Sequence, residues 1–407
     1  MTSSLQAGAT SVAYLVFTLT FSHAMATTAL MVLPAVAPLV ALEYGVDPSL
    51  VGYYITIVSV GLITSLVTVS NLSRRVGGSR TSQIGHGLVG VGVLLMLLPS
   101  IVFVVPGALV IGLGFGMLAP AASALLVRFA PPARRNLVFS IQQTSVPLGG
   151  ALAAIGGPLV AVTFGWRVAF LLAIGLLAAA VVLLHRGRAH WDDDRDPAQH
   201  VLARSPLDGL RTNWEDPRLR RLSLAGMSFC WAQFCLSTFA VVACVAVLDM
   251  SLIAAGLVLM VVQVTNAMGR MLAGWIADRI GSAVRVLRWL AWAMLVLSIG
   301  FLWLTPGLPT AVVYLLFAAF GVTSGAWAGI LMAEVGHLAG QGRVAAVMSG
   351  TLLYVNLGKL SGPAAFALIY GFTQSYNIAF ALLAVPAALA IWCLRPQGRQ
   401  KVELQPA

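Results

Sequence analysis

Two basic residues, Arg270 and Lys359, stand inside long runs of apolar residues, where water is not at hand to solvate a charge. A charged side chain at the centre of a bilayer costs about 2.5 to 3.5 kcal/mol or more, so residues of this kind mark functional sites by default. Arginine offers a planar fork that binds a carboxylate through two parallel hydrogen bonds, and lysine offers a compact point charge. The pair therefore predicts a binding site for one or two acid groups.

No acidic residue lies within the apolar runs to neutralise these two cations. The acids nearest to the runs stand at their two ends: Glu43, Asp47, Asp249, Asp278 and Glu334. Because an arginine cannot become neutral by losing its proton, we expect an anionic ligand at Arg270 and Lys359. The competing interpretation is that the two side chains snorkel to the membrane edge or bind backbone carbonyls.

Amide side chains accompany both cations at helical spacing. Gln263, Asn266 and Arg270 fall at i, i+3 and i+7, so they line one face of a helix. Asn356 stands one turn before Lys359 in the same way. These amides are candidate ligands for the anion, although hydrogen bonding between helices explains such residues equally well.

Two further residues, Trp327 and His23, are candidates for the same site. Trp327 is surrounded by glycine and alanine and could form an aromatic wall or simply pack. His23 stands in the middle of the first apolar run, and its ordinary pKa suits proton transfer, although a structural role through hydrogen bonds is the simpler interpretation. Exchange of one anion for another needs no protein protonation, so protons and a counter-anion both stay open as coupling partners.

The composition places all these residues in a lipid bilayer. Hydrophobic residues make up 59% of the 407 residues and charged residues only 9%, whereas soluble domains carry about 25% charged residues. A membrane helix needs about 20 apolar residues. Twelve runs approach or exceed that length: 12–42, 49–69, 82–98, 107–127, 137–162, 166–184, 222–248, 252–273, 286–304, 310–333, 345–370 and 376–394.

The net charge of +11 follows the topology and does not indicate nucleic-acid binding. The arginines flank the apolar runs and concentrate in alternate breaks, after the second, fourth, sixth, eighth and tenth runs. Positively charged loops remain in the cytoplasm, so both termini are predicted to be cytoplasmic in a bacterial-type inner membrane. The partners expected are the lipid bilayer and a small solute, with no nucleic acid.

One long polar stretch divides the chain. We predict an N-terminal six-helix bundle over 1–185, a cytoplasmic linker over 186–221, and a C-terminal six-helix bundle with a cytoplasmic tail over 222–407. The acidic run Asp192–Asp194 in the linker is expected to be solvated rather than to bind a metal. The four cysteines lack metal-ligand spacing. No metal, cofactor or catalytic residue is therefore expected.

A motif repeats at matching places in the two halves. Gly274-Trp-Ile-Ala-Asp278-Arg279-Ile-Gly281 follows the eighth run, and Ser-Asn-Leu-Ser-Arg74-Arg75-Val-Gly follows the second. Over the whole chain the sequence resembles the major facilitator superfamily, whose loops at these places carry G-x-x-x-D-R-x-G. The resemblance implies an all-α fold of twelve membrane helices in two bundles, which rock about a central site.

In that family the motif is implied to act in conformational gating. Its glycines, Gly274 and Gly281 here, permit a tight turn and close helix contact, and its acid, Asp278, can cap a helix or pair with an arginine. Arg279, Arg74 and Arg75 belong to the same candidate gate, with Arg74 standing where the family has aspartate. A further run, Pro147-Leu-Gly-Gly150, indicates either close packing or a flexible helix.

The arginine of the eighth run with the lysine of the eleventh resembles the anion-binding pair of oxalate:formate antiporters, and the arginine alone resembles that of monocarboxylate transporters. Those proton-coupled relatives place an aspartate where this chain has Asn266. We therefore predict a secondary transporter of a small organic anion. The alternatives are an exporter of hydrophobic or cationic drugs, a sensor or a channel. An intramembrane enzyme is not expected, because no nucleophile and base or metal-binding motif occurs.

Overall fold

The computed structural model describes residues 2–69, 72–131, 135–198, 208–339 and 343–395. The predicted tail over 396–407 and the middle of the predicted linker lie outside these ranges. Every regular element within them is a helix. The all-α prediction is therefore confirmed for the described part of the chain.

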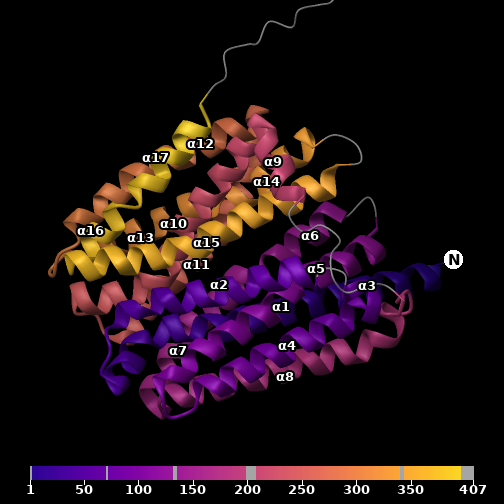
Figure 1. The fold of residues 1–407 in the computed structure, drawn as a ribbon, viewed down its shortest axis with the longest axis horizontal. Helices are drawn as coiled ribbons and strands as arrows, with labels where there is room; N and C mark the ends of the chain where they lie inside the picture. The colour runs from indigo at the N-terminus through magenta and orange to yellow at the C-terminus, as the bar shows by residue number, and fades with distance from the viewer. Residues whose placement is uncertain (1, 70–71, 132–134, 199–207, 340–342, 396–407) are drawn as a thin grey trace, which may run out of the picture.

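The first part of the chain forms helices that lie side by side in the lower half of Figure 1. We call these helices the N-terminal half. Their bounds are α1 Thr2–Tyr44, α2 Val51–Thr68, α3 Leu72–Val76, α4 Gly78–Met96, α5 Val104–Phe129, α6 Arg135–Gln143, α7 Ser145–Phe164 and α8 Trp166–Trp191, with the short helices η1 Pro48–Leu50 and η2 Ile101–Phe103.

The later helices gather in the upper half of Figure 1, and we call α10 to α17 the C-terminal half. The bounds are α9 Asp208–Glu215, α10 Pro217–Leu248, α11 Leu252–Ile280, α12 Ala283–Gly300, η4 Phe301–Trp303, α13 Thr310–Gly325, α14 Trp327–Leu338, α15 Val344–Thr373, α16 Tyr376–Ala381 and α17 Ala384–Cys393. The largest buried apolar cluster comes mainly from these helices, and three smaller clusters come mainly from α1 to α8.

Eleven stretches in the described ranges are long and apolar enough to cross a membrane. The third predicted run, 82–98, is not among them. Its helix, α4, begins at Gly78 and carries Arg80, Gln83 and His86, which lower its hydropathy. It packs along α5 and α8, and Gln83 and His86 are buried, whereas Arg80 is exposed near the start of the helix.

Several predicted boundaries were wrong, and one of them matters for the site. Helix α11 continues to Ile280, so Gly274 and Asp278 lie in its last two turns and not in a loop. Gly281 then ends the helix with a φ of +65°, a left-handed conformation that glycine adopts without strain. Arg270 therefore stands ten residues before the helix end, about 15 Å along its axis at 1.5 Å per residue.

The two halves meet at glycines. A Cβ at Gly52 on α2 would collide with the carbonyl oxygen of Pro363 on α15, and one at Gly256 on α11 would collide with that of Ala154 on α7. The Thr56 hydroxyl donates a 2.9 Å hydrogen bond to the carbonyl oxygen of Leu360. We call these contacts the glycine seam. All of these contacts lie at the end of the molecule at which α2 and α11 begin.

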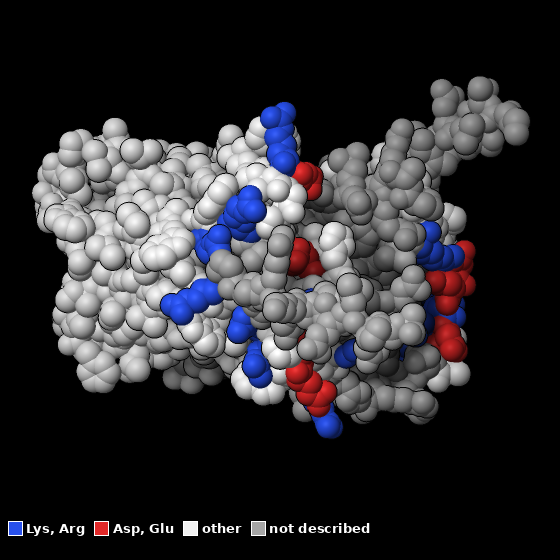
Figure 2. Space-filling view, turned by 90° about the horizontal axis from the view of Figure 1, so that it is seen from above, with Lys and Arg blue, Asp and Glu red and all other residues white. Residues whose placement is uncertain are grey.

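Charged residues are unevenly distributed over the surface. Figure 2 shows a face whose left part carries no coloured Lys, Arg, Asp or Glu, whereas charged groups collect over its middle and right part. A broad uncharged area is what contact with lipid acyl chains requires.

Candidate functional site

Arg270 on α11 is partly buried and has no carboxylate partner among the described residues. Its Nε donates to the Asn266 side-chain oxygen at 3.1 Å and to the carbonyl oxygen of Gly325 at 3.3 Å. These two bonds fix the plane of the guanidinium group. The two terminal nitrogens have no hydrogen-bond partner within the described part, so the two-donor edge is free to bind a ligand.

The two amides predicted beside Arg270 are both buried, but they do different things. Asn266 is 1% exposed and fills the space above Gly325, where a Cβ could not fit. It therefore positions Arg270. Gln263 lies instead against Gly150 of α7, which leaves no room for a Cβ, so Gln263 belongs to the contact between the halves.

Lys359 on α15 is 4% exposed, and its ammonium group lies between two aromatic rings. The Nζ atom is 4.4 Å from the ring centre of Phe234 on α10 and 5.3 Å from that of Phe115 on α5. It makes no hydrogen bond or ion pair with any described residue. Cation–π contacts of a desolvated ammonium contribute about 2 kcal/mol, which offsets only part of its burial.

Arg270 and Lys359 both lie within electrostatic range of the Cys230 thiol on α10. The close approach of α10 and α15 next to Lys359 is made possible by Gly358, where a Cβ would collide with the carbonyl oxygen of Met227. The two cations therefore lie around the same part of α10.

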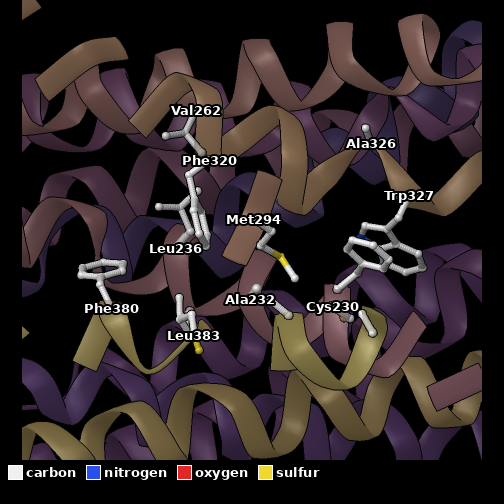
Figure 3. Packing of buried hydrophobic residues seen from close by; sticks show 14 of the residues in the cluster. Cys230, Ala232, Leu236, Val262, Met294, Phe320, Ala326, Trp327, Phe380 and Leu383 are labelled. Carbon is white, nitrogen blue, oxygen red and sulfur yellow. The ribbon is translucent and has the colours of Figure 1, made fainter. Parts of the chain in front are cut away.

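Trp327 is also held by α10. Its indole nitrogen donates to the Gln233 side-chain oxygen at 3.0 Å, and its ring stacks on Phe229 with centroids 6.3 Å apart. Figure 3 shows Trp327 beside Cys230 at one end of the buried cluster, with Phe380 and Leu383 at the other. Trp327 is 4% exposed, so it packs within the C-terminal half, two residues after the carbonyl of Gly325 that accepts from Arg270.

His23 reaches the same region from α1. Its ring meets the edge of Phe115 at a centroid distance of 5.1 Å, and the Gln142 side-chain nitrogen lies 3.5 Å from Nδ1. Phe115 thus contacts both His23 and Lys359. Asn356, in contrast, donates to the carbonyl oxygen of Leu352 on its own helix and makes no described contact with Lys359.

The candidate gate residues lie near the ends of their helices. Asp278 is exposed and has no ion pair among the residues that the structure describes. Arg279 stacks over the Trp275 ring at 4.3 Å. Gly274 has open space around it and makes no close helix contact. Arg74 and Arg75 are exposed at the end of α3.

The acidic run after α8 is solvated as expected at Asp193 and Asp194 but not at Asp192. Asp192 is 5% exposed, and its carboxylate accepts hydrogen bonds from the backbone nitrogens of Ser79 and Arg80 at 2.8 and 2.9 Å. Helix α8 extends to Trp191 and so carries Asp192 to the N-terminus of α4, where a negative charge is favourable. Asp193 and Asp194 pair with Arg128 on α5. We call this group the acidic clamp.

Sequence reasoning missed the residues that contact the predicted site residues. Phe115 and Phe234 lie at Lys359. Gln233 accepts from Trp327, and Gln142 lies beside His23. Phe234 stands near the middle of an apolar run like many other aromatics, so its type gives no signal. Gln233 and Gln142 were detectable, because amides within membrane helices are uncommon and need partners.

Comparison with known proteins gives the family. A model of the Major Facilitator Superfamily matches residues 16–363. The chain is 25% identical over 253 residues to "Probable anion transporter 4, chloroplastic" of Oryza sativa subsp. japonica, covering 58% of this chain and 42% of that protein. It is 29% identical over 190 residues to an "MFS-type efflux pump" of Mycolicibacterium smegmatis, covering 44% and 41%. The matched region thus spans about two fifths of these curated relatives.

Solved structures share the fold at low identity. A POT family transporter in complex with 5-aminolevulinic acid has a TM-score of 0.74 at 15% identity, covering 93% of this chain and 94% of that one. A bacterial homolog of the human lysosomal transporter Spinster, in an inward-facing and unoccupied conformation, has a TM-score of 0.71 at 13% identity, covering 94% and 95%. Together with the family match over most of its length, these similarities show that the chain is a membrane transporter of the major facilitator superfamily.

Proposed function

We propose that this transporter carries a small organic anion, a carboxylate, at a site formed by Arg270 and Lys359. The observation that carries the proposal is that Lys359 is buried and Arg270 partly buried, that neither has a described carboxylate partner, and that the two-donor edge of Arg270 is free. A carboxylate would accept from that edge and be attracted by the Lys359 ammonium. Asn266 holds the fork in place, and Trp327 closes the site on one side.

Transport would occur by alternating access, with the site exposed to each side of the membrane in turn. The glycine seam closes one end of the molecule in this conformation. The other end carries the arginine-rich loops, which we place in the cytoplasm of a bacterial-type inner membrane together with both termini. In this scheme α4, the third predicted run, brings the number of membrane helices to twelve, and its residues Gln83 and His86 are buried against protein. The six-helix bundles 1–185 and 222–407, joined by 186–221, are the moving parts.

Anion exchange and proton symport are both compatible with such a site, as in the oxalate:formate antiporters and monocarboxylate transporters that this pair resembles. The gate residues, Asp278 and Arg279 with Arg74 and Arg75, would exchange partners as the halves move. Asp278 is exposed in this conformation, so it is free to pair with a cation in the other one.

Export of hydrophobic compounds is the second candidate, because one relative is an efflux pump. The other relative is an anion transporter, so relatives alone do not separate the two. A site for hydrophobic cations would place a carboxylate near the membrane centre, whereas the described site is cationic. This charge favours the anion.

The test is a binding screen followed by counterflow. Purified protein is screened for thermal stabilisation by formate, lactate, oxalate and similar carboxylates, with hydrophobic cations such as ethidium as the opposing set. A carboxylate that raises the melting temperature is then measured in proteoliposomes. The proposal expects saturable counterflow that is lost in Arg270→Gln. Stabilisation and transport of the hydrophobic cations alone would overturn it.

A further inference from the structure

His86 on α4 is a buried titratable residue that the proposed transport site does not use. The residue is 1% exposed. Its Nδ1 lies 2.7 Å from the backbone carbonyl oxygen of Ser82 on the same helix, and its Nε2 lies 2.8 Å from that of Ser22 on α1. The imidazole ring therefore joins α4 to α1.

Both partners of the ring are hydrogen-bond acceptors. A neutral imidazole has one N–H donor and one nitrogen lone pair, so one of the two contacts would place two lone pairs against each other. Only the imidazolium form donates from both nitrogens. Both distances are those of hydrogen bonds, so each nitrogen needs a proton to donate. We infer that His86 binds a proton that acts as a bridge between α1 and α4.

The described groups around His86 include no acid, so the backbone dipoles are what stabilise its charge. His23 on α1 is the titratable group that interacts with it. Residues 104–127 of α5 and 168–184 of α8, which pack against α4, contain no titratable side chain, and η2 contains none. On α4 itself Arg80 bonds to Gln83, and the arginines of α3 are exposed. No described acid faces the ring, so the carbonyls of Ser22 and Ser82 hold the proton.

Loss of the proton has a structural consequence. A neutral ring keeps one of its two hydrogen bonds and repels the other carbonyl. Ser82 lies one turn before His86 on the same helix and cannot move away, so the contact with Ser22 on α1 is the one that can open. Ser22 immediately precedes His23, which reaches Phe115 beside Lys359. The bound proton therefore fixes the part of α1 that contacts the cationic site. This last link rests on the proposed function, whereas proton binding at His86 does not.

Nitrogen NMR on the full chain in lipid nanodiscs tests the proton directly. The histidines are labelled with 15N, and the His86 signals are identified by their loss in His86→Gln or, if that variant does not fold, by replacing the other five histidines. We expect two protonated ring nitrogens at the acidic end of the pH range in which the protein is folded, and loss of one proton as the pH rises. One unprotonated ring nitrogen at every pH in that range would overturn the inference.

Melting temperature against pH tests the bridge. The wild type should lose stability over the pH range in which NMR shows His86 losing its proton, and His86→Gln should lack that step. His185→Gln, which changes an exposed histidine on α8, is the matched control and should keep it. A step that persists in His86→Gln would show that the proton does not join the helices. Neither measurement uses a substrate, so failure of anion transport would leave them intact.

Discussion

The ammonium nitrogen of Lys359 lies 4.4 Å from the centre of the Phe234 ring, so a helix of the C-terminal half holds the cation by an aromatic face and not by an acid. Phe115 approaches the same nitrogen from the N-terminal half at 5.3 Å. The site is therefore lined by both halves of the molecule, which is the arrangement that alternating access needs.

The aromatic contact should be measurable as a coupling energy. We expect Phe234→Leu and Lys359→Met each to change stability, and the double variant to differ from the sum by about 0.5 to 2 kcal/mol, because the cation–π contact exists only when both residues are present. Unfolding free energies of the four proteins give this value. A coupling energy of zero between Phe234 and Lys359 would mean that the ring only fills space.

Arg270→Lys should impair carboxylate transport far more than it impairs folding. Lysine keeps the charge but loses the fork, and loss of one hydrogen bond to a charged group costs about 1.5 to 3 kcal/mol, or about a 10- to 100-fold fall in affinity. Uptake into proteoliposomes and melting temperature are measured together. Lys359→Arg should be milder, and Arg285→Lys at an exposed position should transport normally. Normal transport by folded Arg270→Lys and Arg270→Gln would make the arginine structural.

Trp327→Phe should destabilise the protein although it preserves an aromatic ring. The Gln233 side-chain oxygen loses its donor in a buried setting, which costs about 1 to 3 kcal/mol. Adding Gln233→Leu should recover part of this loss, since the unpaired group is then removed. If the double variant is less stable than either single variant, the indole hydrogen bond is not the cause.

The acidic clamp should give a pH dependence with opposite contributions from neighbouring residues. Arg128 lowers the pKa of Asp193, so the stability from this carboxylate is present above its ordinary pKa of about 4 and is lost as the pH falls. Burial raises the pKa of Asp192, so its contribution is present below about pH 4 and diminishes as the pH rises. Asp193→Asn should therefore reduce the loss of melting temperature on acidification. If the melting temperature of Asp193→Asn falls on acidification as much as that of the wild type, the ion pair with Arg128 is not the cause of the acid sensitivity.

The orientation follows from loop charges and can be tested by labelling. In a background without the four buried native cysteines, Asp47→Cys should react with a membrane-impermeant maleimide added outside intact cells, and Asp194→Cys should react only after lysis. Position 47 precedes α2, and position 194 follows α8. Labelling of position 194 but not 47 from outside would reverse the topology.

Periodicity and hydropathy predicted most of the helices, because a run of about 20 apolar residues has the length of a helix that spans a membrane. The same criterion misplaced the start of α4, because its first turn, Gly78 to Thr81, is not apolar. The helix begins at Gly78, one turn before the predicted start at Ser82.

Arg270 and Lys359 could be selected from the sequence because their charge conflicts with their surroundings. Their partners could not, since Phe234 and Phe115 differ in no local way from other aromatics and reach Lys359 only through tertiary packing. The burial of Asp192 was hidden for a related reason. Its environment depends on where α8 ends, and a polar segment near arginines gives no sign of a continuing helix.

The glycine seam determines how the two halves can separate. At Gly52 and Gly256 the backbone of one half lies against a carbonyl oxygen of the other, and the Phe239 and Pro158 rings lie close beside these contacts. Dispersion attraction is short-ranged, and a gap of only about 0.5 to 1 Å already loses about a quarter to a half of it. A half-open joint would retain little of the attraction while exposing both backbones. We therefore expect the closed seam and a fully separated one to be more stable than any state between them.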